Sequence, residues 1–206
     1  MHVIERIGVE WRTRGPAGFA RFARTRLWHL RDDVLFEARF EHGQNQARGA
    51  RLERVVMVDK RALGSVQTKV VETDVLTEQN FAYREAISGR DVLFAATDES
   101  GRVTSYGFVL FDSFYKRVLG ESTDVPMIGN CVTFEPHRRQ GLYARLLLSI
   151  CDALASQGHG RAIITCAPDN LASMGGIRSA GFARIKTCRS LVLFSRWIVF
   201  QTTRRP

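Results

Sequence analysis

Residues 133–143 read TFEPHRRQGLY, and they separate an apolar segment from an amphipathic one. The segment before them, residues 126–134, is almost continuously apolar, as in a central strand covered on both faces. After them, residues 141–157 repeat apolar side chains at helical spacing, and Gly158 is suited to end a helix. The sequence therefore predicts a central strand that turns at Glu135-Pro136 into an amphipathic helix.

The turn between these elements has the chemistry of an anion site. A helix start presents main-chain N–H groups and the positive end of the helix dipole. Gly141 lacks the Cβ that would keep a ligand from the backbone, and Arg138 and Arg139 can donate charge-assisted hydrogen bonds to phosphate oxygens. Alone, such a turn is also typical of an ordinary helix start. Together with the elements that come after it in the chain, the turn favours a site for two linked phosphates.

A second strand and a second helix follow the first helix. Residues 161–166 form an apolar run that predicts a buried strand, and Asn170 is a suitable N-cap for the helix after it. Gly175 and Gly176 would each weaken that helix by roughly 1 kcal/mol. Such a conflict between local preference and the inferred fold indicates a tight approach or a function. Gly181-Phe182 follows at the end of this helix and is the last part of the series of strand, turn, helix, strand and helix.

Residues 128–186 resemble the acyl-CoA-binding half of the GNAT superfamily of N-acyltransferases. In that family a V-x-P-x-x-R-x-x-G-x-G/A motif leads into a helix, and a later N-x-x-S/A followed by G-F closes the core. Residues 133–143 match the first part, and residues 170–182 match the second. The resemblance implies an α/β (α+β) fold with a mixed, mostly antiparallel sheet, a splayed central strand pair and helices on both faces.

The resemblance also implies acetyl-CoA or another acyl-CoA as cosubstrate, and no metal ion. The donor would pair with the strand at residues 130–133 as a surrogate strand, and a main-chain N–H near Cys131 or Val132 would face the thioester carbonyl. The implied donor-binding residues are Cys131, Val132, Thr133, Arg138, Arg139, Gln140, Gly141, Leu142, Tyr143, Ala144, Asn170 and Ser173.

An attacking amine is an ammonium ion at neutral pH, so the reaction needs a group that accepts its proton. Near the implied site in sequence, Asn130 and Glu135 are the catalytic candidates. Asn130 is anomalous in an apolar strand, and because an amide is not a base it would orient a water or the substrate. Glu121 and Asp124 are more typical of solvated loop charges, and His137 of a solvent-facing side chain.

Three positions depart from the family pattern. Proline comes one place late, at Pro136, and Tyr143 stands at the last small position of the phosphate motif, so it either rearranges one N–H contact or turns away from the donor. Ile177 occupies the place where many members carry a tyrosine that protonates the leaving thiolate. An acyl-cysteine on Cys131 is an alternative mechanism, although a buried thiol is the more usual role of such a residue.

The rest of the chain carries weaker signals. Arginines interleaved with aromatic side chains predict a basic amphipathic helix within residues 1–33, ahead of one acyltransferase domain at 34–206. The further expected elements are a hairpin of strands 34–40 and 52–59 around loop 42–50, a helix at 77–88, a hairpin of strands 92–97 and 103–111, a surface loop at 112–124, and closing strands at 185–194 and 197–202.

The chain has 206 residues, of which 45% are hydrophobic, which is enough for one sizeable core. Its net charge of +9 implies attraction to phosphates or other anionic surfaces. The four cysteines form no C-x-x-C pair, so they indicate neither a zinc site nor a disulfide scaffold. With no leader peptide and no long apolar run, the expected location is cytoplasmic.

The preferred interpretation is an N-acyltransferase that moves an acetyl or short acyl group to a primary amine of a small molecule. One alternative uses a long-chain or carrier-bound acyl group, with residues 1–33 contacting an anionic membrane or an acidic carrier protein. A third interpretation is a non-catalytic GNAT-like module that binds nucleic acid or a protein through its basic face, with nucleic acid as the less favoured partner. The apolar C-terminal strands at 191–200 leave a homodimer open.

Overall fold

The computed structural model describes residues 16, 28–40, 52, 54–63, 69–75, 89–193 and 197–204. Within them lie eight strands and four helices. The strands are β1 (Trp28–Arg39), β2 (Val55–Val58), β3 (Val92–Thr97), β4 (Val103–Leu110), β5 (Met127–Thr133), β6 (Arg161–Cys166), β7 (Ala183–Leu193) and β8 (Trp197–Arg204). The helices are α2 (Lys69–Asp74), α4 (Phe114–Val118), α5 (Leu142–Ser156) and α6 (Leu171–Ser179).

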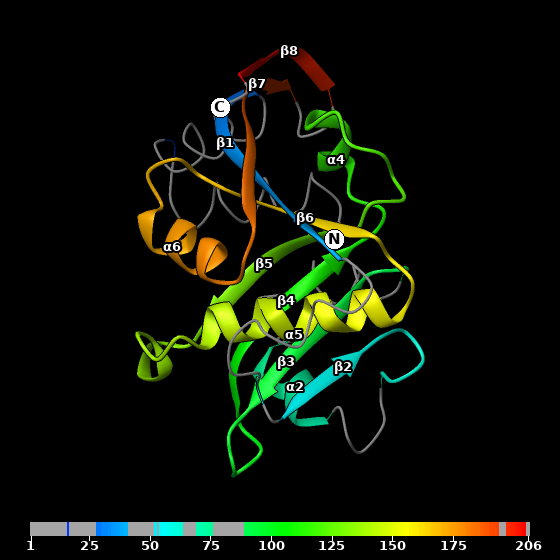
Figure 1. Ribbon diagram of the computed structural model, residues 1–206, viewed down its shortest axis with the longest axis vertical. Coiled ribbons are helices and arrows are strands. Elements are labelled where there is room, and N and C mark those ends of the chain that lie inside the picture. The colour runs from blue at the N-terminus through cyan, green and yellow to red at the C-terminus, as the bar shows by residue number, and fades with distance from the viewer. Residues whose placement is uncertain are drawn as a thin grey trace.

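All eight strands form one sheet in the order β2-β3-β4-β5-β6-β1-β7-β8 (Figure 1). Neighbouring strands are antiparallel except β5 and β6, which lie side by side in the middle of the sheet and are parallel. Two parallel neighbours need a long crossover connection, and α5 supplies it. The predicted mixed, mostly antiparallel sheet is confirmed.

Helices cover both faces of the sheet. Figure 1 shows α5 crossing in front of β3, β4 and β5, with α6 beside it. Leu146, Leu147 and Ile150 of α5 are fully buried in the main apolar cluster, which also contains Ile177 of α6. On the opposite face, Val71 of α2 packs in a second cluster with side chains of β2, β3 and β4. The sheet is therefore the middle layer of three.

The segment that the sequence describes best is the one that positions the site. The strands at 92–97, 103–110 and 161–166 and the central strand at 127–133 lie where periodicity predicts them. Helix α5 has Gly141 as its N-cap and Gln157 as its C-cap, and Gly158 follows with φ 86°. In the first turn of α6, the Asn170 side chain accepts a hydrogen bond from the N–H of Ser173. These predictions are confirmed.

Two predictions near the N-terminus are wrong. Residues 28–33, expected at the end of a helix, form the first half of β1. The expected hairpin of strands 34–40 and 52–59 does not exist, because β1 pairs with β6 and β7 whereas β2 pairs with β3. Apart from Pro16, residues 1–27 of the predicted basic helix lie outside the described residues, as do loop 42–50 and the helix expected at 77–88.

The segment at 112–124, expected as a polar surface loop, is partly helical and packed. It contains α4, and Leu119 directly after the helix is buried. Lys116 is fully buried as well, and its Nζ donates to the carbonyls of Thr123 and Val125 at 2.5 and 2.9 Å. These hydrogen bonds connect the end of the segment to the helix. The polar composition of the segment gives no sign of this packing.

Candidate functional site

The central strands β5 and β6 separate after a short pairing. Both strands are described in full, and pairing joins only Met127 to Ile163 and Ile128 to Ile164. Beyond these pairs β5 continues to Thr133 and β6 continues to Cys166 without pairing to each other. The splayed central pair expected from the sequence is confirmed. Beyond Ile128, the edge of β5 that faces β6 therefore makes no strand pairing with β6 and could pair with another extended chain.

A β-bulge lies in β5 just where it leaves β6. The register with β4 shifts so that two residues of β5, Asn130 and Cys131, face the single Gly107 of β4. Asn130 has φ 50°, in the left-handed region that asparagine tolerates better than most residues. Its side chain is exposed. The bulge gives a backbone reason for an asparagine in an apolar strand, and its catalytic role stays a prediction.

The Cys131 thiol fills the space that Gly107 leaves. A Cβ on Gly107 would lie 2.8 Å from the Cys131 Sγ. Burial of the thiol raises the pKa of Cys131 to about 12, so the side chain is a neutral thiol at neutral pH. A neutral, packed thiol is a poor nucleophile. This geometry favours the packing role of Cys131 over the acyl-cysteine alternative.

The turn from β5 into α5 is tied to the strand it leaves. It begins with a 3-10 turn at Glu135–His137, and the Arg138 Nε then donates to the Thr133 carbonyl at 3.1 Å. Among the described residues, the two terminal nitrogens of Arg138 have no hydrogen-bond partner. Arg139 has φ 64° and an exposed side chain. The turn therefore presents two arginines, one of them braced against the strand end.

The start of α5 is open to solvent at its N-cap. Gly141 is exposed, has φ 71°, and a Cβ added to it would meet no atom within 4 Å. A glycine supplies no side chain to cap the first main-chain N–H groups of the helix. The arrangement leaves those donors and the positive end of the helix dipole without a side-chain cap, next to an exposed residue.

The remaining predicted donor-binding residues lie around this opening. Val132 is half-buried in β5, and Leu142 and Ala144 are half-buried in the first turn of α5. The Gln140 Nε2 donates to the Pro136 carbonyl at 3.3 Å, inside the turn. Asn170 caps the start of α6, which follows the end of β6, by accepting a hydrogen bond from the main-chain N–H of Ser173. Because β5 and β6 are parallel, both helices start at the same edge of the sheet.

Tyr143 shows one of the two arrangements expected for it, and Glu135 is an exposed residue of the turn. Tyr143 turns away from solvent and its ring packs on Gly176 of α6, which is the tight approach that the paired glycines predicted. Glu135, the second catalytic candidate, is exposed at the first position of the 3-10 turn. Its catalytic role stays a prediction, as does the donor-binding role of each residue named above.

A buried acidic side chain that sequence reasoning missed lies on the face opposite α5, beside the open end of β6. Asp33 of β1 is 1% exposed, and the Arg31 Nε donates to both of its oxygens at 3.0 and 2.8 Å. The Tyr115 hydroxyl also donates to Asp33, and the Arg31 guanidinium lies 4.1 Å from the centre of the Tyr115 ring. Burial, together with the Asp33 carboxylate, raises the pKa of Tyr115 above its ordinary value.

This cluster ties the α4 segment to β1 next to the separated strands. In β1, Val34 pairs with Cys166, the last residue of β6, so Asp33 lies just past the end of that strand. The only local signal was the pair Asp32-Asp33 at the start of a strand, and nothing in the sequence joins it to Tyr115.

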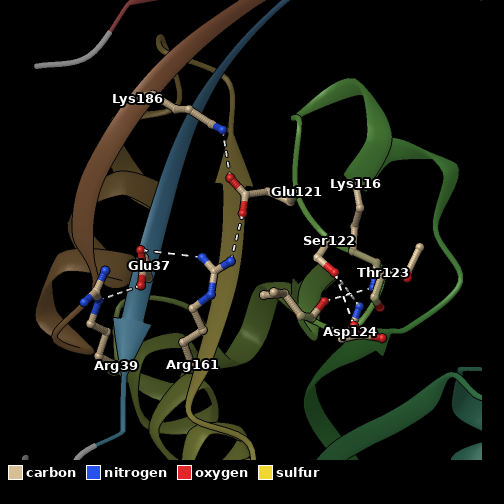
Figure 2. A network of polar contacts seen from close by, with 10 residues as sticks. Glu37, Arg39, Lys116, Glu121, Ser122, Thr123, Asp124, Arg161 and Lys186 are labelled. Carbon is tan, nitrogen blue, oxygen red and sulfur yellow. Dashed lines mark hydrogen bonds and ion pairs between the residues drawn. The ribbon is translucent and has the colours of Figure 1, made fainter.

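The opposite end of β6 carries a network of charges, shown in Figure 2. Glu121, from the segment after α4, accepts from Lys186 of β7 at 2.7 Å and from Arg161 of β6 at 3.2 Å. Arg161 also lies 3.8 Å from Glu37 of β1, which pairs with Arg39. The Glu121 side chain is only 9% exposed, so its expected role as a solvated loop charge is wrong. Asp124 is exposed, as expected.

The network fixes the end at which β5 and β6 remain paired. Arg161 is the first residue of β6, and the main-chain N–H of Ile163 donates to the Pro126 carbonyl just before β5. Charges from three strands and one loop therefore meet at the closed end, while the open end carries the bulge and the two helix starts. The sheet is held together on one side of the junction and left apart on the other.

The solved structures that share this fold include acetyltransferases of the GNAT family. An acetyltransferase from the GNAT family from Colwellia psychrerythraea superposes with a TM-score of 0.53 and 15% identity, covering 86% of this chain and 61% of that one. A GCN5-related N-acetyltransferase from Sphaerobacter thermophilus gives 0.51 and 14%, covering 94% and 58%. A tandem GNAT protein from the clavulanic acid biosynthesis pathway gives 0.53 and 17%, covering 93% and 58%.

The protein therefore has the GNAT fold, as the motifs at 133–143 and 170–182 predict. The chain spans about three fifths of the length of the solved structures it matches. No model of a known protein family matches it, and no curated protein matches it in sequence.

Neither a metal-binding cluster nor a membrane-spanning helix occurs among the described residues. They contain no group of three or more His, Cys, Asp or Glu side chains placed to hold a metal ion. No helix within the described part of the chain has both the length and the apolar character needed to cross a membrane.

Proposed function

We propose that the protein is an N-acyltransferase that moves an acetyl or other short acyl group from acyl-CoA to a primary amine of a small molecule. One observation carries the proposal: the strands β5 and β6 separate beside a helix start that has an exposed glycine as its N-cap. A separated strand edge suits an extended chain that carries amides, and a helix start suits phosphates. Acyl-CoA combines these two parts in one molecule.

The residues present fit such a donor. The main-chain amides of the turn and of the first turn of α5 would hold the pyrophosphate, with Arg138 and Arg139 adding charge. The free edge of β5 at residues 129–133 would pair with the pantetheine amides. When bound, the donor supplies an activated acyl carbon, and a main-chain N–H at the bulge, at Cys131 or Val132, would stabilise negative charge on the carbonyl oxygen.

The acceptor would approach from the face opposite α5, where the α4 segment borders the open end of β6. Asp33 gives this side a buried carboxylate, held by Arg31 and Tyr115. Because Arg31 forms an ion pair with this carboxylate, the cluster holds the α4 segment in place beside the proposed acceptor side and adds no net charge there. The proton acceptor for the attacking amine remains the prediction made for Glu135, with Asn130 orienting a water.

A non-catalytic GNAT-like module is the second candidate, and Ile177 favours it. Ile177 is fully buried in the core of α6 and the sheet, so this position offers no proton to a leaving thiolate. Such a module would bind acyl-CoA without consuming it. Release of free thiol on addition of a panel of amines separates the two candidates, because only the enzyme produces it.

Two glycines of α5 provide a matched test of donor binding. Gly141 before the helix and Gly158 after it both have positive φ, and an added Cβ would meet nothing at either place. Gly141→Ala and Gly158→Ala therefore share the same kind of backbone strain, but only Gly141→Ala places a methyl group at the proposed phosphate site.

The measurement is thermal unfolding with and without acetyl-CoA. A ligand at 100 times its dissociation constant adds about 2.7 kcal/mol to the free energy of unfolding. We expect this stabilisation in the wild type and in Gly158→Ala, and a clear loss of it in Gly141→Ala. Equal stabilisation of both variants would place the donor elsewhere, and no stabilisation of the wild type by acetyl-CoA or by CoA itself would remove the proposed function.

A further inference from the structure

The side chain of Tyr143 lies on the side of the sheet that carries α5 and α6, in the apolar cluster that also includes residues of the separated ends of β5 and β6. It starts from the first turn of α5, and its ring contacts Gly176 of α6. The ring belongs to the same apolar cluster as Cys131 of β5 and Cys166 of β6. The phenol is also close enough to both thiols that they add to the effect of burial in raising the pKa of Tyr143. The ring is thus placed beside both strands on the α5 and α6 side of the sheet.

The ring is held there from several sides. Helix α6 approaches closely because residue 176 has no side chain, and α5 fixes the Cα of Tyr143 one residue after its first helical position. The side chain can leave this position only if α6 moves or if another position becomes available to the ring. The ring is therefore a packed group on the α5 and α6 side of the two strands and not a freely moving one.

The position of the bulge relates this ring to the acyl group. In the proposed function, on which this inference rests, the donor runs along β5 from the phosphate turn to the bulge. The thioester would then lie beside Cys131, and an acyl chain that continued past it on the α5 side would meet the ring of Tyr143. Only a short chain ends before that contact.

We propose that Tyr143, seated on Gly176, is the wall that restricts the donor to short acyl chains. The size of the side chain explains the restriction, because a small residue at position 143 would leave this space to a longer acyl chain. This would make the departure of Tyr143 from the small-residue motif a determinant of specificity and not a defect of the phosphate site.

The test compares binding of CoA, acetyl-CoA and hexanoyl-CoA by calorimetry to the full chain and to three variants. We expect the wild type to bind acetyl-CoA at least about tenfold more tightly than hexanoyl-CoA. Tyr143→Ala should reduce that ratio to about one or reverse it. Tyr143→Phe keeps the ring and should keep the preference. Tyr143→Leu, which keeps an apolar side chain in the core, should show an intermediate ratio even where Tyr143→Ala fails to fold.

The outcomes separate the wall from the proposed function. Should the wild type bind CoA and both thioesters equally well, the wall is absent while donor binding stands. An unchanged ratio in Tyr143→Ala, or in Tyr143→Leu where only that variant folds, overturns the wall as well. A lost preference in Tyr143→Phe would assign it to the hydroxyl group and overturn the steric proposal. If neither CoA nor any thioester binds, the inference fails together with the function on which it rests.

Discussion

A Cβ built on Gly176 of α6 would lie 2.4 Å from Cδ1 and 3.0 Å from Cε1 of Tyr143. Real Cβ atoms essentially never come as close as the first of these distances, and the second is tighter than most real contacts, so Gly176→Ala must displace the ring or the helix. We expect a loss of roughly 1–3 kcal/mol in the free energy of unfolding, as for other overpacked cores. Chemical denaturation of the purified variant measures it.

The neighbouring glycine provides the control for this substitution. Gly175 is in the same helix, but a Cβ there would meet nothing within 4 Å. Gly175→Ala should therefore stabilise the protein by about 0.5–1 kcal/mol, because alanine favours the helix. Effects of the same sign in the two variants would contradict the packing of Tyr143 on α6.

The bulge at Asn130 predicts an unusual order of substitutions. Asn130→Gly should leave the stability nearly unchanged, because glycine adopts φ 50° freely. Asn130→Val places a β-branched residue in the left-handed region, which costs roughly 1–2 kcal/mol or more. Thermal unfolding of both variants measures the difference. If valine, a better strand former, is the more stable variant, the bulge is absent in solution.

The network of Glu121 predicts a large effect of one charge. Glu121→Gln leaves Arg161 and Lys186 without their common partner, and Lys186 is only 17% exposed. Breaking a buried pair typically costs 3–5 kcal/mol, and the partial exposure of Arg161 lowers our expectation to roughly 2–4 kcal/mol. The exposed pair of Arg90 and Asp112 is the control, since Asp112→Asn should barely change the midpoint of denaturation. Similar midpoints for the two variants would contradict the network.

The Cys131 thiol predicts a loss of stability at alkaline pH. Its pKa is about 12 in the folded protein, against an ordinary value of 9.0. Above pH 9 the unfolded chain therefore loses this proton while the folded protein keeps it, so the free energy of unfolding falls by up to about 1.4 kcal/mol per pH unit. Below pH 9 the thiol has no such effect.

Urea denaturation between about pH 8 and 11 tests this dependence. Cys131→Ala removes the thiol and should give a shallower decline than the wild type above pH 9. Some decline will remain, because burial also raises the pKa of Cys166. Identical slopes for the wild type and the variant would show that Cys131 titrates normally in the folded protein.

Arg138 predicts weaker donor binding. Arg138→Ala removes a charge from the turn and the hydrogen bond to Thr133, and we expect acetyl-CoA to bind about tenfold less tightly. Arg184→Ala removes an exposed charge on β7 and serves as the control, with affinity close to that of the wild type. Calorimetry at low and at high salt separates a specific contact of Arg138 from an effect of net charge. An effect of net charge would lower the affinity for acetyl-CoA equally in both variants.

The sequence predicts β5, α5, β6 and α6 because each has a local signal. The helices have apolar periodicity and capping residues such as Asn170, and the two strands are unbroken apolar runs. Short connections join these four elements, so the residues of the proposed donor site all lie within a segment of about 60 residues. That part of the site is local chemistry, and local chemistry can be recognised.

The acceptor side depends on contacts that the sequence does not display. Tyr115 meets Asp33 across 82 residues, and β1 finds its partners in strands that come much later in the chain. Glu121 and Lys116 look like solvated charges because their polar neighbours in sequence hide the strands that bury them. Hydrophobic periodicity indicates how a segment is buried but not which segment buries it.

The two-pair junction of β5 and β6 makes the sheet mechanically unusual. On one side of it lie β2 to β5, and on the other β6, β1, β7 and β8, so the sheet consists of two parts that are joined by two residue pairs and by the apolar core beneath α5. Any extended ligand that pairs with the free edge of β5 while contacting β6 bridges the two parts and sets the angle between them. If the proposed donor binds there, its affinity and the rigidity of the sheet would therefore be coupled.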